Sequence, residues 1–187
     1  MKVYFTASIR GKRLYGENYK KIFEAIQELG YQNVDDLLFR IELGKFYEGS
    51  QKDRVNLYRE TISKIRNADI VILEVSIPSL SMGYVMEKSL VEGKPVIALY
   101  LEGLNSYFAE GIEDERLQVL PYRQDDIKKT LKYATEEARK QIDARFTILF
   151  PPRIMVYLDK VCKEKGVPRS VFIRNLIEER MRKRKEK

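Results

Sequence analysis

Two short segments of the sequence contain residues that could bind an anionic ligand. Each follows an apolar run typical of a β-strand. In the first segment, backbone amides and an arginine, which is always charged, could bind phosphate oxygens. The planar guanidinium of the arginine can bind two of these oxygens at once. The second segment leads into a helix, whose amino end favours anions. The residues are Ser8, Ile9, Arg10 and Gly11 in the first segment and Ser79, Ser81 and Gly83 in the second. Together they predict a site for a nucleoside monophosphate.

The residue types restrict the chemistry that such a site could perform. The 187-residue chain contains no histidine and one cysteine, Cys162. These counts exclude Ser-His-Asp and Cys-His catalysis, histidine-bearing metal sites, intrachain disulfides and thiolate zinc sites. We therefore expect neither a metal nor a cofactor. Any catalysis must use carboxylates, tyrosine, serine, lysine or arginine.

Alternating strands and helices would position the two segments. We predict strands at 2–8, 37–41, 69–75, 95–100 and 117–120, helices at 17–29, 53–67, 84–93 and 124–142, and loops at 8–16, 43–52 and 76–83. The nearly continuous apolar run at 69–75 is typical of a strand that is buried on both faces of a parallel sheet. The alternation favours an α/β fold with a doubly wound, flavodoxin-like or Rossmann-like sheet. In a flavodoxin-like order the first and third strands are neighbours, so the two loops converge on one crevice.

The positive charge is concentrated towards the carboxyl end. The chain has 35 Lys and Arg and 28 Asp and Glu, a net charge of +7. Residues 143–187 contain 13 basic and 6 acidic residues, which is also +7, so the first 142 residues are neutral overall. This asymmetry predicts two domains, 1–142 and 143–187, the second with a polyanion as partner. No apolar run approaches the ~20 residues that span a bilayer, and no signal segment is recognisable, so we expect a cytoplasmic protein without a membrane partner.

The second domain reads as a strand followed by two helices. The segment RFTILF at 145–150 alternates in polarity, Pro151 and Pro152 begin a first helix that ends near Gly166, and a last helix begins at Arg169. A lone strand leaves its backbone hydrogen-bonding groups unpaired and cannot form a core with two helices. The simplest partner is the same strand of a second chain. We therefore expect at least a homodimer.

This pattern resembles the ribbon-helix-helix family of dimeric DNA-binding proteins. The resemblance rests on RFTILFPP, on Gly166-Val167 and on Arg169-Ser170. It implies that two antiparallel strands lie in the major groove, with outward side chains reading bases, and that the start of the second helix clamps a phosphate. The implied DNA-binding residues are Arg145, Thr147 and Leu149 on the strand and Arg169 and Ser170 on the helix. Leu149 departs from the usual polar residue, and a ribbon that only dimerises remains the alternative.

The first domain resembles the nucleoside 2-deoxyribosyltransferase superfamily, and within it the 2′-deoxynucleoside 5′-phosphate N-hydrolase branch. Three blocks carry the resemblance: VYFTASIRG at 3–11, ADIVILEV and PSLSMGY between 68 and 84, and GKPVI at 93–97. The resemblance implies a dimer with Tyr4 as a pocket wall near the sugar. It also implies that Ser106 reaches the phosphate of the neighbouring subunit.

Enzymes of that branch cleave the N-glycosidic bond with two carboxylates, and this chain departs from the pattern at both positions. The nucleophilic glutamate that follows Gly-Tyr corresponds here to Val85, and the aspartate on the preceding helix corresponds to Thr61. Glu60 and Glu87 are the nearest alternatives. Their offsets of about 100° and 200° around a helix turn both away from the crevice.

Three hypotheses follow for the function. The first is a DNA-binding regulator of transcription whose first domain senses a nucleoside monophosphate without catalysis. The second is an active N-hydrolase joined to a dimerisation and DNA-binding module. The third is a structural or antitoxin-like DNA-binding protein without a small-molecule ligand. The first is favoured here, because the phosphate loops are present and the two carboxylates are missing. Each of the two domains is expected to pair with a second chain about its own twofold axis. The protein is a dimer if the two axes coincide and a tetramer if they do not.

Overall fold

The protein consists of two compact units. The computed structural model describes residues 1–41, 43–142 and 148–185, except for the side chains of 43, 45, 47, 178 and 185. Contacts divide the chain into Met1–Asp143 and Ala144–Lys187, one residue from the boundary predicted from charge. Each unit is described by itself.

The first unit is built on a five-stranded parallel sheet with the order β2-β1-β3-β4-β5. The strands are β1 (Lys2–Ala7), β2 (Gln32–Asn33), β3 (Ile70–Glu74), β4 (Val96–Leu101) and β5 (Leu117–Tyr122). The α/β class and the predicted neighbourhood of β1 and β3 are thus confirmed; Tyr4 pairs with Val71 in their register. All five residues of β3 are buried, as expected for a central strand covered on both faces.

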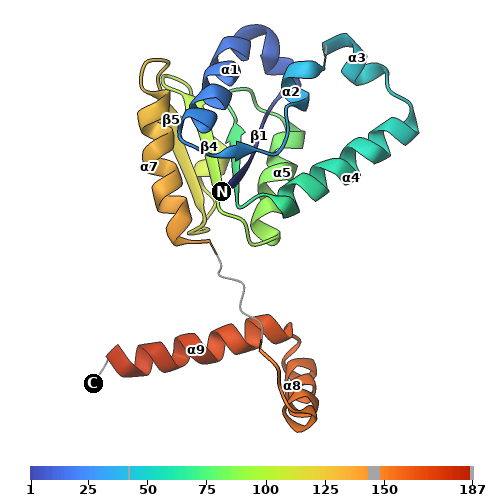
Figure 1. Ribbon diagram of the computed structural model, residues 1–187, viewed down its shortest axis with the longest axis vertical. Helices are drawn as coiled ribbons and strands as arrows, with labels where there is room; N and C mark the ends of the chain where they lie inside the picture. The colour runs from blue at the N-terminus through green and yellow to red at the C-terminus, as the bar shows by residue number, and fades with distance from the viewer. Residues whose placement is uncertain (42, 143–147, 186–187) are drawn as a thin grey trace. The chain divides into compact units, whose positions relative to one another are not determined.

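Helices cover both faces of the sheet (Figure 1). Helices α1 (Lys12–Glu28) and α7 (Ile127–Lys140) pack over one face, where Ile22, Ile72 and Leu131 share a buried core. Helices α4 (Gln51–Asn67) and α5 (Leu80–Val91) cover the other face, where Ile65 and Leu73 belong to a second core. The short helix α6 (Tyr107–Glu110) lies between β4 and β5 along the chain.

The segment after the first helix differs from the prediction. Residues 37–41 are not a strand; Leu37–Arg40 form helix α2, and Leu43–Glu48 form helix α3 within the predicted loop. A short apolar run cannot be assigned to a strand or a helix from periodicity alone. Here the backbone amide of Leu37 donates to the Asp35 carboxylate (3.2 Å), which starts the helical turn.

The two predicted loops also contain more helix than expected. A 3₁₀ turn, η1 (Ile9–Gly11), follows β1 and leads directly into α1. Helix α5 begins at Leu80, so Ser81 and Gly83 lie in its first turns rather than in a loop. The boundary between loop and helix is the least certain feature of a pattern-based assignment, because the first turn makes few intrahelical bonds.

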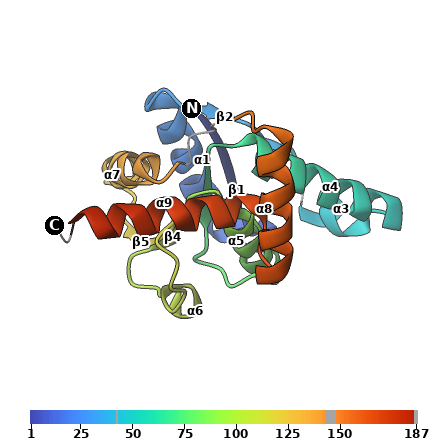
Figure 2. The same ribbon diagram turned by 90° about the horizontal axis from the view of Figure 1, so that it is seen from below.

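The second unit contains helices α8 (Pro152–Lys165) and α9 (Arg169–Lys185), which Figure 2 shows as two separate rods. Pro152 occupies the first position of α8, and Gly166 ends it with a left-handed φ of 66°, a conformation that favours glycine. Residues 148–150 form no strand in the single chain, while Arg145 and Thr147 lie outside the described residues. The predicted ribbon needs a second strand. None of the helices described for either unit is long and apolar enough to cross a membrane.

Candidate functional site

A pocket of about 700 Å³ lies on the α4 and α5 side of the sheet. This volume is within the usual range of small-molecule sites. β1 contributes Tyr4 and Thr6, which alternate onto the same face of the sheet and lie in the pocket lining with Ser8 beyond them. The rest of the lining comes from the turn after β1, from the segment after β2, from α4, and from the start of α5 with the residues just before it.

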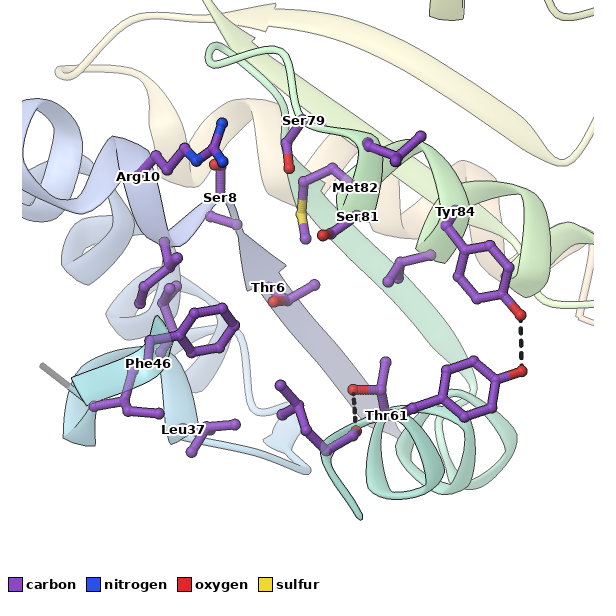
Figure 3. A pocket seen from close by; sticks show the side chains of 18 of the residues that line it. Thr6, Ser8, Arg10, Leu37, Phe46, Thr61, Ser79, Ser81, Met82 and Tyr84 are labelled. Atoms are coloured by element: carbon purple, nitrogen blue, oxygen red, sulfur yellow. Dashed lines mark hydrogen bonds between the residues drawn. The ribbon is translucent and has the colours of Figure 1, made fainter. Parts of the chain in front are cut away.

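One end of the pocket gathers groups that suit an anion. Ser8, Ile9 and Arg10 enter from the turn after β1, opposite Ser79 and Ser81; Figure 3 shows Ser8, Arg10 and Ser79 at the same end. Ser79 is the N-cap residue of α5, yet its side chain caps no amide of the helix. The amino end of α5, with its first-turn amides and the positive end of the helix dipole, thus lies at this end of the pocket. The two segments singled out in the sequence meet here.

Three other predicted ligand residues are outside the pocket lining. The backbone amide of Gly11 donates to the Ser8 carbonyl (2.9 Å), and a Cβ at position 11 would stand 2.0 Å from the Tyr19 hydroxyl oxygen. Gly11 thus permits the close packing of α1 against the turn. Gly83 lies on the exposed side of α5. Ser106 precedes α6, and its predicted role at a neighbouring subunit stays a prediction.

The opposite end of the pocket is mostly apolar, although Arg54 of α4 and Asp35 are also in the lining on the side of α2 to α4. Its walls come from α2, α3 and α4 and the residues that join them. These side chains are Leu37, Leu38, Ile41, Phe46 and Leu57. At the rim, the hydroxyls of Tyr58 and Tyr84 are hydrogen-bonded (2.9 Å), which links α4 to α5 (Figure 3). Sequence reasoning missed this half of the pocket, because residues 37–52 were assigned to a strand and a loop.

Asp35 and Tyr4 form a polar cluster in the pocket wall. Burial raises the pKa of Tyr4 to about 12, against the effect of hydrogen bonds with Thr6 and Thr61, while the negative charge of Asp35 raises it further. Asp35 Oδ1 forms an ion pair with Lys64 Nζ of α4 (3.0 Å), and the Asp35 side chain is only 10% exposed. The hydroxyl of Thr61 donates to the Leu57 carbonyl of the preceding turn (2.8 Å).

The carboxylates considered from the sequence do not reach the pocket. Glu60 is 62% exposed and lies 3.9 Å from Lys64 Nζ, and Glu87 is exposed on α5; neither is in the lining. Val85 and Thr61, at the two positions where the resemblance places carboxylates, do line it. Asp35 is the one Asp or Glu among the described residues of the lining. In the same described part of the chain, no three His, Cys, Asp or Glu side chains cluster as metal ligands would.

A buried acid lies on the other face of the sheet, next to the turn that carries Ser8. Glu74, at the end of β3, is fully buried; Ser76 and Tyr122 (3.1 Å) donate hydrogen bonds to its Oε1. Tyr19, whose hydroxyl donates to the Ser8 carbonyl (3.4 Å), also interacts with this carboxyl. Burial raises the pKa of Glu74, and the hydrogen bonds from Ser76 and Tyr122 lower it by less.

The raised pKa of Glu74 predicts a specific dependence of stability on pH. Because the folded pKa lies above the unfolded value of about 4.3, the folded state binds the proton more tightly, and stability falls as pH rises from about 4.5 through the folded pKa. Glu74→Gln removes this titration. We expect the melting temperature of the variant, relative to the wild type, to increase between about pH 4.5 and 7.5. The exposed Glu87→Gln is the matched control, and a parallel shift in both variants would contradict the assignment.

In the second unit, the predicted DNA-binding residues that the structure describes are on the surface. Leu149 is 93% exposed, and Ser170 is exposed in the first turn of α9. Arg169 pairs with Asp159 of α8, and this hydrogen bond raises the pKa of the guanidinium. Contact of these residues with DNA stays a prediction.

The chain is similar to several proteins that are named as enzymes. A protein of Thermofilum pendens named as a 2′-deoxynucleoside 5′-phosphate N-hydrolase is 36% identical over 129 residues, which cover 65% of this chain and 85% of that protein. The 5-hydroxymethyl-dUMP N-hydrolase of Mus musculus is 26% identical over 69% of this chain and 76% of its own length. A CMP N-glycosidase of Clostridium botulinum shares the fold with a TM-score of 0.50, at 15% identity, over 71% of this chain and 99% of that one. No protein-family model matches the chain.

These relatives overturn the favoured hypothesis of a transcription regulator without catalysis. They are named as N-hydrolases, and none of these names concerns regulation. The hypothesis rested on the two missing carboxylate positions alone, and a fold can carry its chemistry on other residues. The identity with the Thermofilum pendens protein extends over most of that protein's length. The chain therefore belongs to the 2′-deoxynucleoside 5′-phosphate N-hydrolase family.

Proposed function

We propose that the first unit binds a 2′-deoxynucleoside 5′-phosphate in its pocket and hydrolyses the N-glycosidic bond. The observation that carries the proposal is the division of the pocket into an anion-binding end and an apolar end. Ser8, Arg10 and Ser79 at one end suit the 5′-phosphate, and Phe46 and Leu57 at the other suit a planar base. The sugar then lies over Thr6, between the two ends.

The names of the relatives support the class of reaction and of substrate. The dense polar groups at the phosphate end would hold the substrate while the base departs towards the apolar end.

The test is direct. The purified full chain is incubated with each of the 2′-deoxynucleoside 5′-monophosphates dAMP, dGMP, dCMP and dTMP, and release of free base is followed by chromatography. We expect release from at least one nucleotide and much slower release from the corresponding nucleoside, which has no phosphate. Absence of free base from all four nucleotides, at enzyme concentrations near those of substrate, would refute the proposal.

We also propose that the second unit is a ribbon-helix-helix module that pairs two chains through residues 145–150 and contacts DNA. Several apolar side chains on its two helices are left exposed in the single chain, as a dimerising surface requires. They are Val156, Tyr157, Leu176, Ile177 and Met181. The net charge of +7 in residues 143–187 supports a polyanion as partner.

Oligomeric state and DNA binding are tested separately. Light scattering of the full chain at micromolar concentration should give a dimer or a tetramer, and a monomer would defeat the ribbon assignment. Ile177→Asp should weaken the dimer, whereas Lys183→Asp should leave it intact. The second variant should lose affinity for random duplex DNA and flatten the salt dependence of binding, since each basic contact releases counterions.

A further inference from the structure

The family's two carboxylate positions are occupied by Val85 and Thr61, whose neutral side chains can neither act as a general base near neutral pH nor stabilise a cation as a carboxylate does. Hydrolysis in this pocket therefore needs a carboxylate from another part of the chain. Asp35 is the one that the described lining contains. We propose that Asp35 is the general base of the hydrolysis, an inference that rests on the proposed function and assigns its catalytic residue.

The backbone brings Asp35 to this place. β2 pairs in parallel with the start of β1, and the amide of Val34 donates to the carbonyl of Val3 (2.9 Å). Asp35 follows immediately, close enough to Tyr4 for its negative charge to raise the pKa of the phenol. Its carboxylate then starts helix α2 by accepting the amide of Leu37. These contacts fix the side chain at the carboxyl end of a strand, where ligands of open α/β sheets bind.

The electrostatic surroundings suit a base. Lys64 Nζ and the Leu37 amide both bind Oδ1, so Oδ2 is the oxygen that remains for a water among the contacts described for this side chain. The Lys64 ammonium offsets the cost of holding a negative charge in a wall where the side chain is only 10% exposed. A hydrogen bond from a water to Oδ2 is stronger there than in bulk solvent.

Asp35 also lies close to the position from which the family's aspartate would act. The negative charge of Asp35 raises the pKa of Tyr4, and Tyr4 is hydrogen-bonded with Thr61. Both residues thus surround the same phenol, one from the segment after β2 and one from α4. The carboxylate of this pocket is therefore in the segment after β2, whereas the resemblance places the family's aspartate on α4.

The step that we assign is a single displacement. A water that donates to Asp35 Oδ2 attacks C1′, the C1′–O bond forms, and its proton passes to the carboxylate. The C1′–N bond breaks, and its electron pair leaves with the base, which takes up a proton from solvent. Asp35 then returns its proton to solvent. With Val85 in place of a nucleophile, no glycosyl-enzyme forms, and the configuration at C1′ is inverted.

Asp35→Asn is the test in the full-length protein. It keeps the shape and the acceptor for Leu37 but removes the base, so we expect hydrolysis of the nucleotide that the wild type cleaves to fall by at least about 10²-fold, the lower range for a general base. The loss should be in kcat, with KM nearly unchanged; the melting temperature should fall because Lys64 loses its ion-pair partner, so the rates are compared well below it. Glu60→Gln and Glu87→Gln are the matched controls and should retain wild-type rates.

Azide provides a second measurement, because it is a nucleophile that needs no deprotonation. Added to Asp35→Ala with the same nucleotide, azide should restore release of the base and give the α-glycosyl azide, inverted relative to the β-nucleotide. Wild-type turnover in Asp35→Asn would overturn the inference and leave the proposed function standing. Loss of nucleotide binding in that variant, or failure of azide to restore release, would also overturn it. If the wild type showed no activity, both the proposed function and the role of Asp35 would be refuted.

Discussion

Val85→Glu combined with Thr61→Asp should raise the rate of deoxynucleotide hydrolysis by at least about 10²-fold over the wild type, the lower range of what a positioned carboxylate contributes. Both side chains line the pocket, Val85 at 5% exposure, so the two new carboxylates would enter the space that the substrate occupies. The variant would gain a nucleophile for a covalent route and a group that helps the base leave. The measurement is free base released per unit time at saturating nucleotide.

Two further variants decide whether the gain has this cause. Val85→Gln with Thr61→Asn supplies similar volume without charge and should not exceed the wild-type rate. Asp35→Asn added to the carboxylate pair should leave the raised rate intact, since the covalent route does not depend on the original base. It should also relieve repulsion, because Asp35 and the new carboxylate at position 61 would both lie next to Tyr4.

Stability must be followed in the same experiment. A charge at position 85 is placed where only 5% of the side chain is exposed, and an uncompensated buried charge costs several kcal/mol. We expect the melting temperature to fall in the variant that carries the carboxylates and to recover when a nucleotide binds. An unchanged rate in a folded, nucleotide-binding variant would show that the alignment of Val85 with the family nucleophile is wrong.

The regular parts of the fold were predictable because their sequence patterns have one interpretation. The apolar runs at 69–75 and 95–100 form β3 and β4, since such runs fit strands that are buried on both faces. Once β1 and β3 are neighbours, the segments at Ser8 and Ser79 must meet, because parallel strands end at the same edge of a sheet. The phosphate end of the pocket follows from these two facts.

The other end of the pocket was not predictable in the same way. Residues 37–41 contain a short apolar run that suits a strand or a helix, and the decision depends on the hydrogen bond from Leu37 to Asp35. The position of Asp35 depends on a β2 strand of only two residues and on Lys64, 29 positions further along the chain. One local signal was available: the adjacent acids Asp35 and Asp36, which lie between the predicted helix at 17–29 and the apolar run at 37–41.

The second unit shows a different limit. The helices α8 and α9 and the glycine that separates them could be found from the sequence, and Gly166 has the left-handed conformation that its place predicts. A strand that pairs only with a second chain cannot be formed by one chain. We predict this strand because its backbone hydrogen-bonding groups would stay unpaired without a second chain.

Arg10→Ala should weaken binding of a nucleoside monophosphate by about 10- to 150-fold, because a hydrogen bond to a charged group is worth roughly 1.5–3 kcal/mol. Arg10 enters the pocket from the turn after β1, at the end that Ser79 shares (Figure 3). A guanidinium there can bind two phosphate oxygens at once, which a single amide cannot do. Calorimetry with dCMP and with deoxycytidine measures the effect.

The comparison between these two ligands makes the prediction specific. Deoxycytidine has no phosphate, so Arg10→Ala should leave its affinity unchanged, and the advantage of dCMP over deoxycytidine should shrink by the same factor. Arg13→Ala is the matched control, because Arg13 is exposed on α1 and absent from the described lining of the pocket. If Arg13→Ala weakened dCMP as strongly as Arg10→Ala, the effect would be a general loss of positive charge. If neither variant changed the affinity, the phosphate would bind elsewhere, and the orientation of the substrate from Arg10 towards Phe46 would have to be reversed.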